Sequence, residues 1–138
     1  MLDADLWKKV AAVDAGTQRR LVAELLRLVM DAAPVTTGRA QIEAALAAGS
    51  YGDEALRDWL SQSSTAATAA SLDADELDGD QAEAKRIAQQ ARGYKAAYLA
   101  LDTDPARAAG EVAYEAMALL GQDPITATTK AILDDPSR

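Results

Sequence analysis

Carboxylates are the side chains of this chain that could take part in chemistry, because histidine and cysteine are both absent. Histidine is the usual general base near neutral pH and the most frequent metal ligand. The absence of both residue types excludes Ser–His and Cys–His nucleophile arrangements and zinc sites of the ordinary kind. The sequence therefore predicts a protein that is not an enzyme and has no cofactor, and the placement of Asp and Glu becomes the main question.

The stretch from Leu72 to Asp80 is strongly acidic, and we expect it to be an exposed linker. The residue spacing of this stretch does not match that of an EF-hand calcium-binding loop. If Gly79 is the loop glycine, Ala74 occupies the first ligand position and Lys85 the twelfth. The stretch instead predicts contact with a cationic surface. Its candidate partner-binding residues are Asp73, Asp75, Glu76, Asp78 and Asp80.

Glu111 and Glu115 are a second candidate site, because residues four apart lie on one face of a helix. All-α nucleotide pyrophosphohydrolases hold magnesium with two acidic pairs of the form Glu-x-x-Glu and Glu-x-x-Asp. Glu111 and Glu115 do not have that spacing, and Asp80 with Glu83 forms a helix cap, so no second pair is present. The sequence predicts no metal site, and we include both glutamates among the partner-binding candidates.

The net charge indicates the kind of partner. The formal net charge is −8 and the isoelectric point about 4.4. Residues 1–69 carry 7 basic and 9 acidic residues, a net of −2, and residues 70–138 carry 7 and 13, a net of −6. Such a field repels nucleic acid and anionic lipid and attracts cationic proteins. Solubility alone accounts for the same charge equally well.

Length and composition bound the class of protein. A chain of 138 residues has the size of one ordinary domain, here residues 1–138. No stretch approaches the roughly 20 apolar residues of a membrane span, and the acidic N-terminus does not resemble a secretory signal. The lack of cysteine fits a reducing compartment, so we expect a cytoplasmic location.

The stretch from Asp80 to Gly121 predicts a central antiparallel pair of helices. Asp80 followed by Glu83 has the form of a capping box. Asp104 followed by Pro105 is a strong start for the second helix, and Gly121 is a natural end. The turn between the two helices is too short to separate them, so they should be neighbours.

Helical periodicity extends over the rest of the chain, and no alternating strand pattern occurs. Thr17 is the expected cap of the second and most hydrophobic helix, and Thr36 or Thr37 that of the third. The fold class is therefore all-α, a single-domain bundle of about six helices. Asp3 or Asp5 is the expected cap of the first helix, and Asp53 that of the fourth. The helices outside the central pair are expected from Asp3 or Asp5 to about Asp14, from Gln18 to about Ala33, from Gly38 to Ala48, from Asp53 into the Ser/Thr/Ala run, and after Asp123-Pro124.

The run from Pro34 to Ala45, Pro-Val-Thr-Thr-Gly-Arg-Ala-Gln-Ile-Glu-Ala-Ala, resembles the Ala-rich helical immunity proteins of bacterial polymorphic toxin systems. In that family a Pro…Arg…Ala-Ile-Glu stretch opens a helix and long Ala-rich helices follow, as after Ala91-Arg92-Gly93 here. The family often has a second Arg and histidines in these helices, which this chain lacks. The resemblance implies a non-catalytic cytoplasmic protein that blocks a toxin, and toxins of the nuclease kind tend to be cationic.

These observations favour a binding protein that acts by occluding a basic protein partner, most concretely an immunity protein or similar inhibitor. An alternative is a structural or adaptor subunit that forms a homo-oligomer through the small residues of the central helices, such as Gly93 and Gly110. A magnesium-dependent hydrolase built on carboxylates is the least favoured hypothesis.

Overall fold

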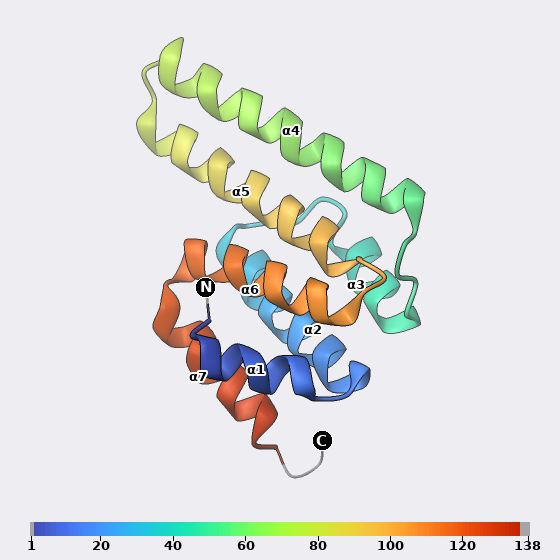
Figure 1. The fold of residues 1–138 in the computed structure, drawn as a ribbon. Helices are drawn as coiled ribbons and strands as arrows, with labels where there is room; N and C mark the ends of the chain where they lie inside the picture. The colour runs from blue at the N-terminus through green and yellow to red at the C-terminus, as the bar shows by residue number, and fades with distance from the viewer. Residues whose placement is uncertain (1, 136–138) are drawn as a thin grey trace.

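A computed structural model describes residues 2–135, whose regular secondary structure is all helix, with no strand among them. The all-α prediction is therefore confirmed, and the described residues form seven helices where the sequence predicts about six. The helices, shown in Figure 1, are α1 (Ala4–Ala12), α2 (Ala15–Ala32), α3 (Arg39–Ala48), α4 (Glu54–Glu76), α5 (Gln81–Ala100), α6 (Pro105–Leu120) and α7 (Gln122–Leu133).

Aspartate carboxylates cap five of the helices by accepting backbone N–H groups of the first turn. The prediction was wrong for α2, where the cap is Asp14 and not Thr17, and Gly16 lies inside the helix. The Thr17 hydroxyl instead donates to Asp14 Oδ1 at 2.6 Å, so the threonine supports the cap rather than forming it. The capping residues are Asp3, Asp14, Asp53, Asp80 and Asp104.

Two further predicted helix starts are wrong, because a glycine directly precedes each helix. Gly38 is the residue before α3, at φ +81°, so neither Thr36 nor Thr37 caps this helix. Gly121, at φ +90°, both ends α6 and precedes α7, which begins at Gln122, before Asp123-Pro124. A side chain is disfavoured at these φ values, and glycine allows the chain to change direction there.

Helix α2 lies at the centre of the fold, as its hydrophobic sequence predicts, and it packs against α5, α6 and α7. Its inward side chains, among them Leu21, Leu25 and Val29, are at most 1% exposed. Most of the opposing surface on α5 and α6 is alanine, and these alanines are fully or almost fully buried. Small side chains allow close approach of the helix backbones, so the core is thin and dense.

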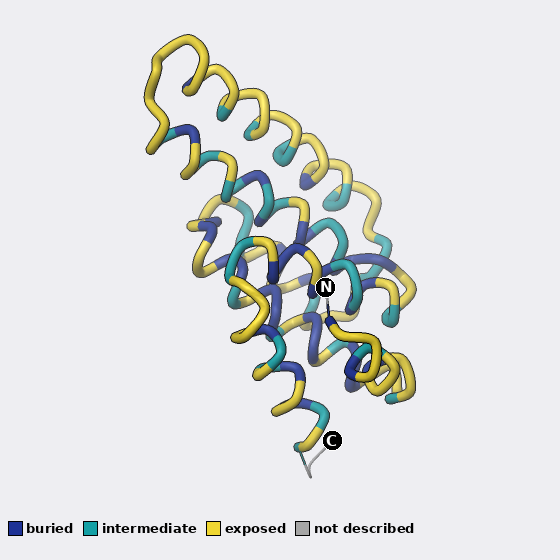
Figure 2. Tube along the Cα trace, turned by 60° about the vertical axis from the view of Figure 1, so that its left-hand side comes forward, coloured by how far each residue is buried: buried dark blue, intermediate teal, exposed yellow. Residues whose placement is uncertain are grey.

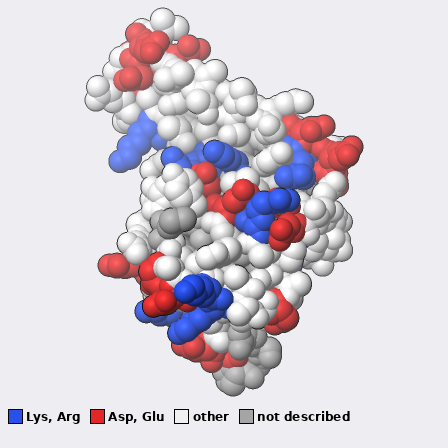
Figure 3. Space-filling model, viewed as in Figure 1, with Lys and Arg blue, Asp and Glu red and all other residues white. Residues whose placement is uncertain are grey.

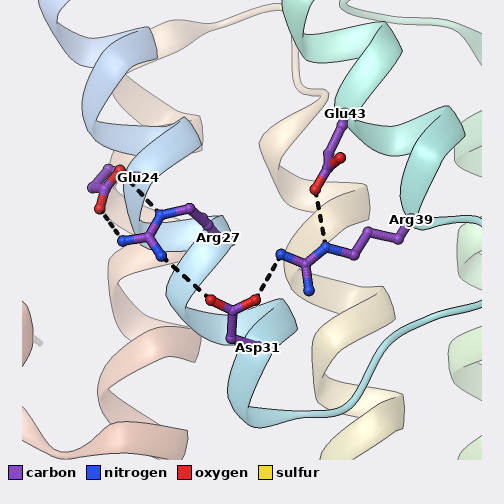
Figure 4. A network of polar contacts seen from close by, with 5 residues as sticks. All are labelled: Glu24, Arg27, Asp31, Arg39 and Glu43. Carbon is purple, nitrogen blue, oxygen red and sulfur yellow. Dashed lines mark hydrogen bonds and ion pairs between the residues drawn. The ribbon is translucent and has the colours of Figure 1, made fainter.

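Two polar clusters hold neighbouring helices in register. At the turn between α5 and α6, Asp102 accepts from Arg107 Nε at 2.6 Å, and Arg19 of α2 donates to the Asp102 carbonyl at 2.7 Å. Between α2 and α3, Figure 4 shows Asp31 between Arg27 and Arg39, with Arg39 Nη2 2.6 Å from Asp31 Oδ1. Glu24 and Glu43 complete this second network at its two ends.

Helices α4 and α5 form an antiparallel pair that projects beyond the rest of the molecule, and we call it the arm (Figure 1). Its outer part is largely exposed (Figure 2), because α4 packs mainly on α5. Ser71 Oγ donates to the Ala84 carbonyl at 2.6 Å, and Ser64 Oγ to the Ala91 carbonyl at 2.9 Å. These hydroxyl bonds hold together two helices that have little apolar bulk between them.

The arm also corrects the predicted linker. Residues from Leu72 to Glu76 are the last turns of α4, and only Leu77–Asp80 connect the two helices. The helix continues because buried Ala74 packs at the end of the arm and its carbonyl accepts from the Asp80 N–H at 2.9 Å. The acidic residues are thus held on an ordered hairpin end.

Candidate partner-binding site

The end of the arm gathers five carboxylates, and we call Asp73, Asp75, Glu76, Asp78 and Asp80 the acidic tip. All five residues are exposed, the first three on α4 and the other two in the turn. None of them forms an ion pair with another residue of the described range 2–135. Asp80 uses one oxygen to accept the Glu83 N–H at 3.0 Å. Figure 3 shows the acidic side chains at the end of the arm.

The basic residues that follow the acidic tip do not neutralise it. Arg86 pairs with Glu83 of its own helix, its Nε 2.9 Å from Glu83 Oε2, and this hydrogen bond lowers the pKa of Glu83. Glu83 therefore does not complete the capping box that the sequence predicts. The acidic tip remains a cluster of like charges that faces solvent.

Two leucines accompany the acidic tip, and the sequence analysis did not identify them. Leu77 is 77% exposed in the turn, and Leu72 is 55% exposed on the last part of α4. The two leucines give the end of the arm an apolar surface among its charges, which a partner can cover. The signal in the sequence was two leucines in a stretch whose other members are polar or small, which is too weak to separate an exposed leucine from a buried one.

Glu115 lies away from the acidic tip and is buried, whereas a partner-binding residue was expected to be accessible. It is 3% exposed on α6, with Oε2 2.7 Å from Arg92 Nη1 and Oε1 3.6 Å from Lys95 Nζ, both on α5. Arg92 is twelve positions beyond Asp80, the residue that caps α5, which corresponds to roughly 18 Å along the helix. The structure therefore does not bring Glu115 together with the acidic tip, and a carboxylate so buried is not available to a partner.

Glu111 lines a pocket of about 570 Å³ between α1, α5 and α6. The pocket has an apolar base in which the Trp7 ring covers Gly110, so closely that a Cβ on Gly110 would lie 2.9 Å from the ring. Glu111 forms no ion pair within residues 2–135. The remaining lining residues are Leu2, Lys95, Leu99, Arg107, Tyr114 and Glu115.

This pocket has mixed charge. Two basic and two acidic side chains line it, and of these Arg107 is engaged by Asp102 and Glu115 by Lys95 and Arg92. An apolar hollow with balanced charge does not select a cation or an anion. It is a space for an apolar group, and Tyr114, which is 57% exposed, lies at its edge.

Within residues 2–135 no three Asp or Glu side chains converge as a metal-binding cluster. In the same range no helix combines the length and apolarity needed to cross a bilayer. What the described surface does present is a protruding pair of helices with a charged and partly apolar end.

Comparison of the chain with protein-family models, with curated proteins and with solved structures finds no match. The site therefore has to be interpreted from its own geometry and charge.

Proposed function

We propose that this protein is a non-catalytic binding protein whose acidic tip docks into a cationic protein and occludes it. The observation that carries the proposal is the exposed acidic tip, whose five carboxylates have no ion-pair partner within residues 2–135. Like charges placed together at the end of a projection destabilise one another, and a cationic partner relieves this repulsion. The same field accelerates encounter with such a partner.

The shape of the arm supports occlusion as the mode of action. Helix α4 has 23 residues, which corresponds to roughly 34 Å, and the arm is two helices wide. A projection of that size can fill a cleft in a partner, with Leu77 at its end as the apolar contact and the carboxylates around it as the charged rim. In its most specific form the proposal is an immunity protein or similar inhibitor of a basic toxin, as the resemblance of the Pro34–Ala45 run implies.

Affinity capture from the native host, followed by mass spectrometry, tests the proposal. The bait is compared with a tip variant in which Asp73, Asp75 and Asp78 are changed to Asn and Glu76 to Gln. Asp80 is kept, because it caps α5. We expect the wild-type bait to recover one basic protein in stoichiometric amount at low salt, and the tip variant to lose it.

A control with the same change in charge distinguishes the acidic tip from net charge. The body variant replaces four other exposed acids, as Asp5→Asn, Glu54→Gln, Asp58→Asn and Asp123→Asn. The body variant should retain the partner. Loss of the partner by both variants, or recovery of the same partner by all three baits, would show that the acidic tip is not the binding site.

A further inference from the structure

One face of the arm carries a shallow groove between α4 and α5. Two adjoining hollows of about 350 and 220 Å³ lie along it. On the α4 side the groove is lined by hydroxyl residues, which include Ser64 and Thr68, and by the exposed Leu72. On the α5 side it is lined by Ala88, Ala91, Arg92, Lys95 and Tyr98. No other helix of the described residues covers this groove face, although Glu115 of α6 reaches its inner end.

The α4 side of the groove face is uncharged along its middle, whereas α5 carries one cation there, Lys85, seven positions before Arg92 and therefore on the same side of the helix. No charged residue occurs on α4 from Ser61 to Leu72. Towards the tip, Asp75 lies seven positions after Thr68 and therefore on the same side of α4, with Glu76 beside it. Towards the body, the cations are Arg92 and Lys95, whose side chains are 40% and 59% exposed. Figure 3 shows this face, with acidic side chains at the end of the arm, an uncharged expanse along α4 and basic side chains along α5.

The hydrogen bonds between the two helices fix the spacing of these charges. Ser64 is level with Ala91 and Ser71 with Ala84, so α4 and α5 match residue for residue in opposite directions. Arg92 and Lys95 are therefore level with positions near the beginning of the uncharged stretch. Asp75 lies about 12 to 15 residues of α4 away from them, which corresponds to roughly 18–22 Å. The midpoint between Asp75 and the two cations falls close to Thr68.

We propose that a second copy of this chain binds to the groove face, arm against arm and antiparallel, with the two-fold axis beside Thr68. In that arrangement Asp75 and Glu76 of each chain lie opposite Arg92 and Lys95 of the other, and the uncharged surfaces of the two α4 helices meet between them. Leu72 of each chain, exposed in the single chain, enters the hollow of the other beside Ser64 and Ala91. A parallel arrangement would instead place like charges opposite one another.

This pairing goes beyond the proposed function and does not depend on it, because it requires no second protein. The two share Asp75 and Glu76, so a cationic partner and the second copy compete for these carboxylates. Asp73 belongs to the acidic tip but lies on another side of α4, since it is two residues from Asp75. Asp73 belongs only to the acidic tip, whereas Asp75 belongs both to the tip and to the proposed dimer contact. Substitutions at these two positions therefore distinguish the two proposals.

Disulfide cross-linking tests the position of the axis, since the chain has no cysteine of its own. Thr68→Cys places a thiol beside the proposed two-fold axis. Ala70→Cys is the matched control, an exposed position on the opposite flank of the same helix. On mild oxidation, Thr68→Cys should form a covalent dimer at least about tenfold faster than Ala70→Cys, because proximity raises the effective concentration of the two thiols. Equal rates, or no dimer from either variant, would overturn the proposal.

Sedimentation equilibrium tests the charges. The wild-type chain should self-associate at low salt, and Asp75→Lys should raise the dimer dissociation constant by about tenfold or more, because it changes two equivalent contacts from attraction to repulsion. Asp73→Lys makes the same change in net charge and should alter the constant by less than about threefold. A monomeric wild-type chain over the whole concentration range, or equal effects of the two substitutions, would refute the antiparallel pairing. If the wild-type chain dimerises as described but captures no cationic partner, the result would count only against the proposed function.

Discussion

Individual carboxylates of this chain have environments that spacing along the sequence does not reveal. Glu111 and Glu115 occupy equivalent positions of one helical face, and both were expected at the surface. The structure leaves Glu111 beside the pocket and buries Glu115 against Arg92 and Lys95. The helical period predicts which side of α6 they share, but the covering cations come from α5, and their position depends on how the two helices cross.

A stability measurement separates the roles of these two glutamates. Glu115→Gln should lower the free energy of unfolding by about 1–3 kcal/mol, because it removes a charge-assisted bond and leaves a buried amide N–H group without an acceptor. Glu111→Gln, the matched control on the same helix, should change it by less than about 0.5 kcal/mol. Urea denaturation measures both values. Equal effects of the two substitutions would show that burial of Glu115 contributes nothing to folding.

Asp102 gives the fold a defined sensitivity to acid. The Arg107 hydrogen bond, opposed by burial and aided by the Asp104 N–H, lowers the pKa of Asp102 from 3.8 to about 2. Because the folded pKa is the lower one, the unfolded chain takes up the proton first as the pH falls. The stabilisation from Asp102 is therefore complete above about pH 4 and is lost between about pH 4 and pH 2.

The variant Asp102→Asn tests this assignment, since it cannot titrate. At pH 6 the wild-type chain should be more stable than the variant by about 1–2 kcal/mol, the contribution of a hydrogen bond to a charged group. The difference should shrink steadily as the pH is lowered from 4 towards 2. Urea denaturation of both chains across this range measures it. A difference that is constant with pH would mean that the Asp102 charge does not stabilise the fold.

Helix beginnings in this protein follow from local chemistry, whereas helix ends depend more on tertiary contacts. Asp53, Asp80 and Asp104 were predicted as caps, and Asp3 as one of two candidates with Asp5. Each of the four accepts a first-turn N–H group, because a cap needs only residues two or three positions apart. The end of α4 was not predicted. The Ser/Thr/Ala run has little apolar periodicity, and its helix persists because two serine hydroxyls bond to carbonyl groups of α5.

The contact between α5 and the segment after α2 depends on a glycine. A Cβ on Gly93 would lie 2.6 Å from Val35 Cγ2 and 3.1 Å from Ala33 Cβ, and both neighbours are buried. Gly93→Ala should therefore lower the free energy of unfolding by about 1–3 kcal/mol, although alanine is the better helix former. Thermal unfolding of the variant measures the change.

Gly110→Ala is the control for this prediction. Its Cβ would meet only the outer edge of the Trp7 ring, at 2.9 Å, and that ring is half-buried beside the pocket. The ring can tilt into the open space, so this substitution should cost clearly less than Gly93→Ala. A larger loss of stability from Gly110→Ala than from Gly93→Ala would contradict the close approach described for α5.

At the scale of the whole molecule, the charge is separated rather than uniform. The second half of the sequence carries most of the net negative charge, and the structure places five of its carboxylates at the end of one projection. The sequence could identify these residues, because they lie within eight positions of one another in the chain. It could not show that they are presented at the end of an arm with Leu77 exposed among them, since this depends on α4 pairing with α5 alone over its outer part.

The most direct test of the central claim is the dissociation constant of the captured basic protein at ionic strengths from about 0.05 to 0.5 M. For the wild-type chain and the body variant, we expect tight binding at low salt that weakens by at least about tenfold over this range. The tip variant should bind weakly at every salt concentration, with a much smaller dependence on salt. If the tip variant binds as tightly as the wild-type chain and with the same salt dependence, the acidic tip is not the surface through which this protein acts.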